Sequence, residues 1–101
     1  MLSILIPTYN YSIVELVRNV QKQAIIAKIQ FELIVLDDCS KDQEIINDNN
    51  LIKELDFCIL YKNEKNLGRT ASRNYLASKA SYNKLLFLDA DVQPKYDNFI
   101  S

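Results

Sequence analysis

Residues 85–91 of this chain read Leu-Leu-Phe-Leu-Asp-Ala-Asp, and this stretch decides the fold that the sequence predicts. Four bulky apolar residues in a row are typical of a strand buried on both faces of a parallel sheet. Ligands of open α/β sheets gather at the carboxyl ends of such strands. Two carboxylates at that place suit a hard divalent cation such as Mg²⁺ or Mn²⁺. The same acids could instead cap a turn, and the pattern alone leaves both interpretations open.

Three other short apolar runs lie earlier in the chain, at residues 2–6, 31–36 and 57–61. Most of their positions are apolar, whereas a sheet with one face in water would show alternation. Together with residues 85–88 they predict about four parallel strands that are covered on both sides.

Helical patterns occupy the intervals between these runs. The first begins with Ser12 and Glu15, and the second with Ser40 and Gln43, each pair having the spacing of a capping box. Residues 47–50 are all Asn or Asp, which disfavour a helix interior, so we expect the second helix to break there. The apolar positions at helical spacing in the first pattern are Ile13, Leu16, Val17, Val20 and Ala24.

The third helical pattern follows Gly68, and the whole order is β-α-β-α-β-α-β. This order predicts an α/β fold, a Rossmann-like parallel sheet of about four strands with flanking helices. We expect one domain over residues 1–101, since this length is close to the commonest domain size.

Composition excludes several functional classes. A net charge of −1 gives no attraction to nucleic acid, and two cysteines without any histidine make a zinc site unsupported. No apolar run approaches the ~20 residues that span a bilayer, and the N-terminus lacks the basic region of a signal peptide. We therefore expect a cytoplasmic domain, although a longer parent protein can be membrane-associated through other parts.

Polar residues with chemical potential follow the first two strands. Pro7 has no amide hydrogen, so we expect the first strand to end there. Tyr9 could lay its ring on a flat base or simply pack in a turn. Asp37 and Asp38 are adjacent carboxylates that repel each other, so the pair is unfavourable unless it binds a partner. A carboxylate can accept the imide N–H that uracil has and cytosine lacks. Ordinary turn acids, with Ser40 as the next helix cap, are the alternative.

The segment before and within the third helical pattern is basic. Gly68 is the only glycine, which indicates a backbone conformation or a close approach that a side chain would prevent. Arg69 and Arg73 are four residues apart and share a helix face, where guanidinium groups could bind phosphate or merely face water. One glycine also excludes the GxGxxG and GxxxxGK nucleotide-binding motifs.

Four motifs in this order resemble glycosyltransferase family 2, the nucleotide-sugar-dependent inverting transferases of GT-A fold. They are residues 3–10 (Ser-Ile-Leu-Ile-Pro-Thr-Tyr-Asn), 33–42 (with Asp37-Asp38-Cys39-Ser40), 66–74 (with Gly68, Arg73 and Asn74) and 86–91, which ends in an Asp-x-Asp motif. The resemblance implies an incomplete GT-A domain that binds a nucleotide-diphosphate sugar.

The same resemblance implies roles for individual residues. Asp38 would read the base, commonly uracil, and Asp91 would coordinate Mg²⁺ or Mn²⁺ on the diphosphate. Cys39 is a departure, because the family usually has glycine there. The implied nucleotide-sugar residues are Pro7, Thr8, Tyr9, Asp38, Gly68, Arg73 and Asp89, and the implied metal ligands are Asp91 and Asp89.

Family members continue with a half that binds the acceptor and supplies the catalytic base, whereas only residues 92–101 follow Asp91 here. Asp97 is too close to the metal motif to be that base, so we assign no catalytic residue. We expect residues 1–101 to be the donor-binding half of a hexosyltransferase, inactive alone. The expected partners are a UDP-sugar, a carbohydrate or lipid-linked acceptor of the full-length protein, and no nucleic acid.

Three further expectations remain open at this stage. The chain could be a nucleotide-sugar-binding remnant without turnover. It could also be a phosphoacceptor receiver domain, with Asp89 as the strand-end acceptor, although that domain needs an acid pair after the first strand. Finally, a missing second half would expose the edge beside the last strand and favour self-association.

Overall fold

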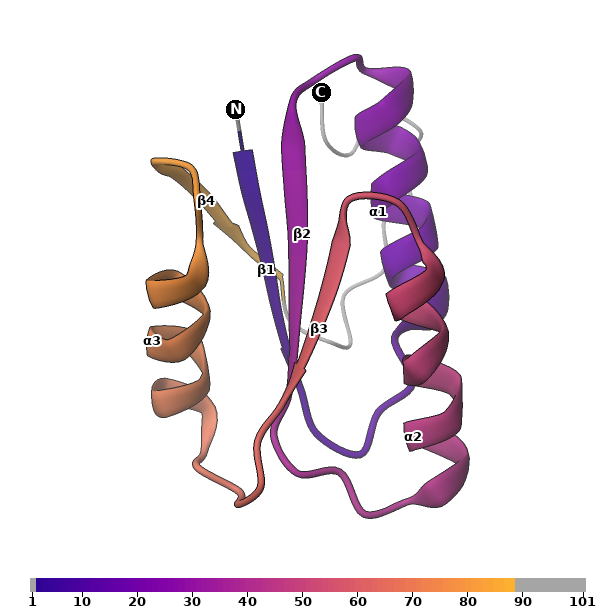
Figure 1. The fold of residues 1–101 in the computed structure, drawn as a ribbon, viewed down its shortest axis with the longest axis vertical. Coiled ribbons are helices and arrows are strands. Elements are labelled where there is room, and N and C mark those ends of the chain that lie inside the picture. The colour runs from indigo at the N-terminus through magenta and orange to yellow at the C-terminus, as the bar shows by residue number, and fades with distance from the viewer. Residues whose placement is uncertain (1, 89–101) are drawn as a thin grey trace.

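The computed structural model describes residues 2–88, with helices and strands alternating along the chain (Figure 1). This confirms the predicted order, with one added 3₁₀ helix. The elements are β1 (Leu2–Thr8), α1 (Val14–Ile26), β2 (Phe31–Asp37), α2 (Gln43–Asn50), the 3₁₀ helix η1 (Leu51–Glu54), β3 (Cys58–Lys62), α3 (Arg69–Lys79) and β4 (Lys84–Phe87).

The four strands form one parallel sheet in the order β3-β2-β1-β4. The chain therefore builds outward from β1 to β3 and then returns to the other side of β1. The strand order reverses between β1 and β4, and open α/β sheets bind ligands at the carboxyl ends of the strands beside such a switch point. The predicted fold class is confirmed.

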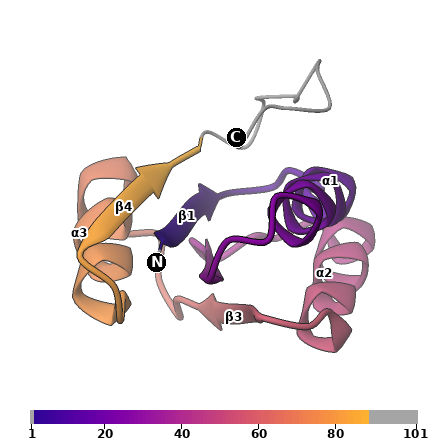
Figure 2. The same ribbon diagram turned by 90° about the horizontal axis from the view of Figure 1, so that it is seen from above.

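Helices cover both faces of the sheet, with α1 and α2 on one side and α3 on the other (Figure 2). Successive strand residues point to opposite faces, so β1 and β2 contribute side chains to two hydrophobic cores, one on each face of the sheet. The larger core contains Ile4, Ile6, Phe31, Leu33 and Val35 from the strands, with Ile13, Leu16, Val17, Val20, Ala24, Ile52 and Leu88. The smaller core contains Leu5, Ile34, Leu36 and Leu76. All five apolar positions predicted for the first helix are buried in the larger core.

Pro7 does not end the first strand, contrary to the sequence prediction. Strand β1 continues to Thr8, with Pro7 opposite Leu36 of β2. The N–H of Leu2 donates to the carbonyl of Gln30, just before β2, and the carbonyl of Thr8 accepts the N–H of Asp38, just after β2. The even-numbered residues of β1 therefore make the main-chain hydrogen bonds to β2. The nitrogen of Pro7 therefore faces the β4 side and points away from β2; among the described residues, β1 pairs with β4 from Leu2 to Leu5. No β1–β2 hydrogen bond is lost, which is why proline is tolerated here.

The first helix has no capping box, so that prediction is wrong. Its N-cap residue is Ile13, without a side-chain cap of its own, and the Ser12 hydroxyl bonds Asp48 at 3.4 Å instead. The cap comes from α2, where the side-chain oxygen of Asn49 accepts the N–H of Ile13 at 2.9 Å and its amide group donates to the Tyr11 carbonyl at 3.0 Å. A distant side chain thus replaces the local signal.

The second helix begins two residues later than the predicted Ser40 cap. Asp42 is its N-cap, accepting from the N–H groups of Glu44 at 3.0 Å and Ile45 at 3.4 Å. The predicted break at residues 47–50 is wrong, because α2 contains all four of these residues and ends only after them, at Asn50, where η1 follows directly. The third helix follows Gly68 as expected.

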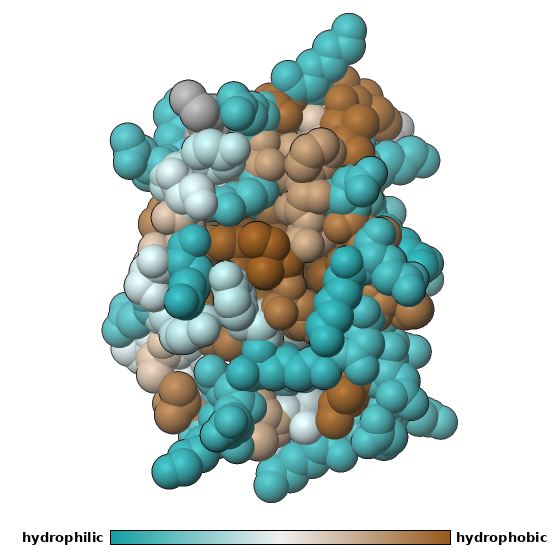
Figure 3. Space-filling view, in the orientation of Figure 1, coloured by the Kyte–Doolittle hydropathy of each residue, from teal (hydrophilic) through white to brown (hydrophobic). Residues whose placement is uncertain are grey.

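The two ends of the molecule differ in surface character. Apolar surface gathers in the centre and upper right of Figure 3, whereas the lower end is largely hydrophilic with isolated apolar patches. No helix within residues 2–88 is both long and apolar enough to cross a membrane.

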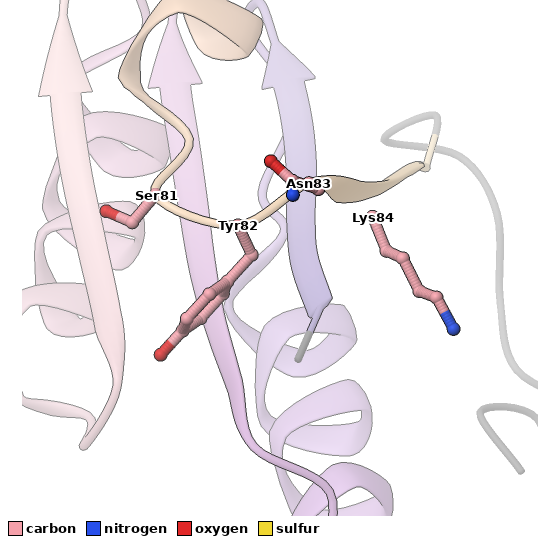
Figure 4. Close-up of a pocket in the computed structure, with 4 residues that line it drawn as sticks. All are labelled: Ser81, Tyr82, Asn83 and Lys84. Atoms are coloured by element: carbon pink, nitrogen blue, oxygen red, sulfur yellow. The ribbon is translucent and has the colours of Figure 1, made fainter.

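One hollow of about 340 Å³ lies in the connection between α3 and β4, lined by Ser81, Tyr82, Asn83 and Lys84 (Figure 4). Lys84 pairs with Leu2 at the amino ends of the strands. This hollow is therefore at the edge opposite the carboxyl ends, where an α/β sheet ordinarily binds its ligand.

The Asn49 cap generates a test of stability. Asn49 is 1% exposed, so Asn49→Ala leaves the N–H of Ile13 without a partner in the interior. We expect a loss of about 2–3 kcal/mol in the free energy of unfolding, measured by urea denaturation. The control is Asn47→Ala on the same helix, where the exposed side chain bonds only Gln43, and it should change stability by less than about 0.5 kcal/mol. Equal effects of the two variants would contradict the capping role.

Candidate functional site

Three loops meet at the carboxyl edge of the sheet, the lower end of Figure 1. They are residues 9–13 after β1, 38–42 after β2 and 63–68 after β3. Main-chain hydrogen bonds join them, from the Asp38 N–H to the Thr8 carbonyl at 2.8 Å and from the Asn63 N–H to the Asp37 carbonyl at 2.9 Å. The sequence-predicted residues of the first three motifs thus belong to one edge.

Asp38 is the centre of this edge. Its Oδ1 accepts from the Leu67 N–H at 2.8 Å and from the Asn63 side-chain amide at 2.9 Å. Its Oδ2 accepts from the Gly68 N–H at 2.8 Å. Its main-chain carbonyl accepts from the Asn66 side chain at 3.3 Å. A single residue after β2 therefore fixes the whole loop that follows β3.

The Asp38 carboxylate is 5% exposed, yet it stays charged at neutral pH. Burial raises its pKa, but the hydrogen bonds from Leu67, Asn63 and Gly68 outweigh burial and bring the pKa below its ordinary value of 3.8. The Ser72 hydroxyl adds to this lowering, although it makes no hydrogen bond of ordinary geometry within the described residues.

The adjacent carboxylate also has an internal partner. Asp37 Oδ1 accepts the N–H of Ser40 at 2.8 Å, and the side chain is 2% exposed. The Ser40 hydroxyl in turn accepts the N–H of Asn10 at 2.8 Å. Backbone N–H groups on two different loops therefore stabilise this acid pair, and Ser40 serves the loop instead of capping α2.

Cys39 occupies a backbone conformation that favours glycine, with φ of +65°. Non-glycine residues in this region cost about 1–2 kcal/mol, so the departure from the usual family glycine places strain directly after Asp38. The thiol lies 3.4 Å from the Glu64 carbonyl, which ties the strained residue to the 63–68 loop.

Gly68 is needed for its conformation and not for a close approach. Its φ is +88°, and a Cβ added there would meet no atom within 4 Å. This conformation turns the chain into α3 while the N–H of Gly68 points at Asp38. Since α3 has no side-chain cap of its own, Asp38 supplies negative charge at its N-terminus.

The residues predicted after β1 differ in accessibility. Thr8 is 4% exposed and its hydroxyl donates to the Tyr11 carbonyl at 3.1 Å, so its side chain is part of the loop framework. Pro7 is half-buried within the strand. Tyr9 is 44% exposed and is the one of the three whose side chain is freely available to a ligand.

Arg73 lies against the far edge strand. Its guanidinium carbon is 4.4 Å from the ring centroid of Phe87 in β4, a cation–π contact. Phe87 is two residues before Asp89 in the sequence. Arg73 therefore brings positive charge to the end of β4, beside the switch point.

The predicted metal ligands Asp89 and Asp91 lie outside the described residues. Within residues 2–88, no group of three His, Cys, Asp or Glu side chains converges in a way that could hold a metal ion. Cys58 is not a ligand candidate either: burial, helped by the charge of Asp56, raises its thiol pKa to about 11.

Sequence reasoning missed the asparagines that build the edge. Asn63 and Asn66 both donate to Asp38. The side chain of Asn10 accepts the N–H groups of Lys41 at 2.6 Å and Asp42 at 3.2 Å. Their positions in the loops that follow β1 and β3 were the available signal, because asparagine bonds nearby backbone and tolerates positive φ, as Asn10 does at +49°.

The sequence profile described as "Glycosyl transferase family 2" matches residues 3–100. The chain belongs to glycosyltransferase family 2. The match spans all four motifs that carried the resemblance, and the family's GT-A fold agrees with the observed parallel sheet. Membership also excludes the receiver-domain alternative.

Two curated relatives illustrate the similarity. An uncharacterised glycosyltransferase of Haemophilus influenzae is 33% identical over 93 residues, which cover 90% of this chain and 29% of that protein. The poly(ribitol-phosphate) β-N-acetylglucosaminyltransferase TarS of Staphylococcus aureus is 32% identical over 91 residues, covering 88% of this chain and 16% of TarS. The chain thus spans less than a third of either relative.

Solved structures give the same picture. TarS residues 1–349 in complex with UDP-GlcNAc superpose with a TM-score of 0.71 at 32% identity, over 89% of this chain and 26% of that one. The mannosyltransferase PcManGT of Pyrobaculum calidifontis, in complex with GDP-Man and Mn²⁺, has a TM-score of 0.74 at 22% identity, over 89% and 27% of the two chains. The second likeness supports the fold alone.

The Asp38 network generates a prediction of acid sensitivity. Asp38→Asn replaces one of the two acceptor oxygens by an NH2 group, which must face the N–H of either Leu67 or Gly68, so we expect a loss of about 3 kcal/mol at pH 7 in urea denaturation. Because the folded pKa is lowered, the carboxylate stabilises fully above pH 3.8, and this stabilisation disappears as the pH falls through the lowered value. The difference between wild type and variant should shrink over the same range.

The matched control is Asp42→Asn, an identical change at the exposed N-cap of α2. Asparagine caps helices as well as aspartate does, so this variant should stay within about 0.5 kcal/mol of wild type. An Asp38→Asn variant as stable as Asp42→Asn would refute the central role of Asp38.

Proposed function

We propose that this chain is the donor-binding part of a glycosyltransferase that takes a UDP-sugar. Family membership shows a glycosyltransferase domain, and the choice of UDP rests on the carboxyl edge described above. TarS, 32% identical, was crystallised with UDP-GlcNAc. We assign the nucleotide sugar to the edge formed by Pro7, Thr8 and Tyr9 together with Asp38, Gly68, Arg73 and Asp89.

The observation that carries the proposal is the state of Asp38. A carboxylate has about four acceptor positions, and three are taken by Asn63, Leu67 and Gly68. From the groups that the structure describes, Oδ1 accepts two of these bonds and Oδ2 one, and we assign the remaining acceptor position of Oδ2 to the base. Because its lowered pKa keeps the group charged, Asp38 can only accept a hydrogen bond. The imide N–H of uracil satisfies this position, whereas cytosine presents an acceptor there.

We assign a divalent metal to Asp91 with help from Asp89. The donor chemistry fits, because carboxylate oxygens suit Mg²⁺ and Mn²⁺, and Asp89 follows two residues after the end of β4 in the sequence. When bound, the ion supplies Lewis-acid stabilisation of charge on the diphosphate. Arg73, held against Phe87 of the same strand, adds positive charge nearby.

The proposed reaction of the whole protein is a single displacement at the anomeric carbon of the sugar. An acceptor hydroxyl loses its proton to a general base and its oxygen attacks that carbon. The bond to the diphosphate breaks on the opposite face, and UDP leaves with the electron pair. The configuration is thereby inverted. No residue among 2–88 is assigned as the base, and a carbohydrate or lipid-linked acceptor is proposed.

Two further expectations remain proposals. We propose a cytoplasmic location for the domain. We also propose self-association at high concentration through β4, which pairs with β1 along one side and leaves Leu85 42% exposed.

A test of base recognition can be made without changing the protein. UDP should bind more tightly than CDP in calorimetric titration, and N3-methyl-UDP, which lacks the imide hydrogen, should lose at least about tenfold in affinity. The loss reflects a charge-assisted hydrogen bond that the methyl group cannot make. Equal affinity for UDP, CDP and N3-methyl-UDP would remove the basis for assigning uracil to Asp38.

The metal assignment has its own test. UDP at a hundredfold excess over Kd should stabilise the protein by ~2.7 kcal/mol, and more of the melting-temperature rise should appear with Mn²⁺ or Mg²⁺ than with chelator. Asp91→Ala should abolish the metal-dependent part and leave the base contact intact. Asp97→Ala, the matched control, should keep both. If the stabilisation by UDP changes neither with metal nor with Asp91→Ala, the metal assignment is wrong and Asp89 and Asp91 are turn caps.

A further inference from the structure

Strand β3 forms one outer edge of the sheet, with β2 beside it and β4 at the opposite edge (Figure 2). The main-chain N–H and C=O groups along an edge strand can pair with another chain, and proteins commonly prevent this with proline or with lysines along the strand. In β3, residues 58–61 carry no charge. The one charged residue, Lys62, is at the end of the strand, and its Nζ donates to Asn50 Oδ1 at 2.6 Å. This edge therefore has little protection against pairing.

The hydrogen bonds between β3 and β2 show which main-chain groups of β3 face outward. The Phe57 carbonyl accepts the N–H of Leu33 at 2.8 Å, and the Asn63 N–H donates to the Asp37 carbonyl at 2.9 Å. Alternate residues of a parallel strand bond the same neighbour, so the odd-numbered residues of β3 bond β2. The even-numbered residues of β3 direct their main-chain groups away from β2.

These outward-facing residues are Cys58, Leu60 and Lys62. The Cys58 N–H donates to the Leu55 carbonyl at 3.3 Å. Within residues 2–88, no second strand pairs with β3 to bond the Cys58 carbonyl or the N–H and C=O groups of Leu60 and Lys62. Five main-chain groups on this edge can therefore accept or donate hydrogen bonds to a further strand.

Ile59 gives the same edge an apolar surface. Its side chain is 41% exposed and lies on the same face of the sheet as Tyr61, which packs against the smaller core. The buried residues of that core come from β1, β2 and α3, so Ile59 lies outside it. Apolar surface gathers at the centre of Figure 3, where β3 crosses the same view in Figure 1.

We propose that β3 pairs with β3 of a second copy of this chain, antiparallel, about a two-fold axis through Leu60. Leu60 then lies opposite the partner's Leu60, and the two exchange a pair of main-chain hydrogen bonds. Each Lys62 N–H donates to the carbonyl of the Cys58 opposite. The two sheets join into one continuous sheet, and the two-fold symmetry closes the assembly at two copies.

The side chains of β3 fit this register. Ile59 lies opposite the partner's Tyr61 at two symmetric positions, and a β-branched residue beside an aromatic one is a favourable cross-strand pair. Lys62 lies opposite Cys58, so no two like charges of the paired strands face each other. A shift of one residue would set the outward-facing groups opposite groups that already bond β2. The strand is thus complementary to itself in the register centred on Leu60.

Sedimentation velocity of the chain, from about 1 to 500 μM, tests the pairing. An edge of one short strand is smaller than a standard interface, so we expect a dimer with a Kd of about 10–100 μM. Ile59→Lys places two charges in the interface and should weaken the dimer by at least about tenfold. The control is Leu85→Lys on β4, where the leucine is 42% exposed, and it should leave this Kd unchanged.

A second pair of variants tests the main-chain hydrogen bonds. Lys62→Pro removes an N–H that faces away from β2, so it costs no bond within the sheet, and it should weaken the dimer by about tenfold or more. Lys62→Ala removes the same side chain but keeps the N–H, so this matched control should dimerise as wild type does. Amide hydrogen exchange adds a direct measurement: the N–H groups of Leu60 and Lys62 should exchange more slowly in concentrated than in dilute wild type.

Three results would overturn the proposal. The first is a chain that stays monomeric at about 500 μM. The second is a dimer that Leu85→Lys disrupts and Ile59→Lys leaves intact, since association would then use β4. The third is exchange at Leu60 and Lys62 that does not change with concentration, and this result decides the question even if Lys62→Pro fails to fold.

Discussion

The acceptance of two backbone N–H groups by one buried carboxylate is the interaction on which the carboxyl edge depends. Asp38 lies after the central strand β2, and the donors from Leu67 and Gly68 come from the loop after β3. A charge with 5% exposure is stable only when it is hydrogen-bonded, and this requirement works in both directions. The carboxylate needs the loop, and the loop, which begins α3, needs the carboxylate.

Near the starts of the other two helices, a neutral side-chain amide oxygen accepts main-chain N–H groups in the same way. Asn49 of α2 accepts the first N–H of the α1 region, and Asn10 after β1 accepts N–H groups that lead into α2. The starts of α1 and α3 are therefore held by side chains from elsewhere in the chain, whereas α2 has its own cap in Asp42 and Asn10 adds to it. Because the three helices and three loops share these contacts, the edge is organised as a unit, and a ligand that binds there meets preformed groups.

Strain at this edge fits the same view. Cys39 and Asn10 both have positive φ, at positions directly after or near a strand end. Such conformations persist when surrounding contacts hold them, and they cluster at functional sites. The neighbours of Cys39 are fixed from both sides, by Asp38 with its five hydrogen bonds and by Ser40 with its bonds to Asp37 and Asn10.

The sequence by itself determined the layered fold, because the spacing of apolar residues and the composition of each strand indicate locally which positions are buried. The four apolar runs, the α/β order, the buried positions of the first helix and the role of Gly68 were all readable in this way. The tertiary structure decided what depends on partners distant in sequence. Pro7 could stay in β1 because its nitrogen faces away from β2, and Asn49 could replace the predicted cap of α1. The bonding of Asp38 to the loop after β3 could not be predicted either, since Leu67 and Gly68 lie 29 and 30 positions after Asp38 and only folding brings their N–H groups to one carboxylate.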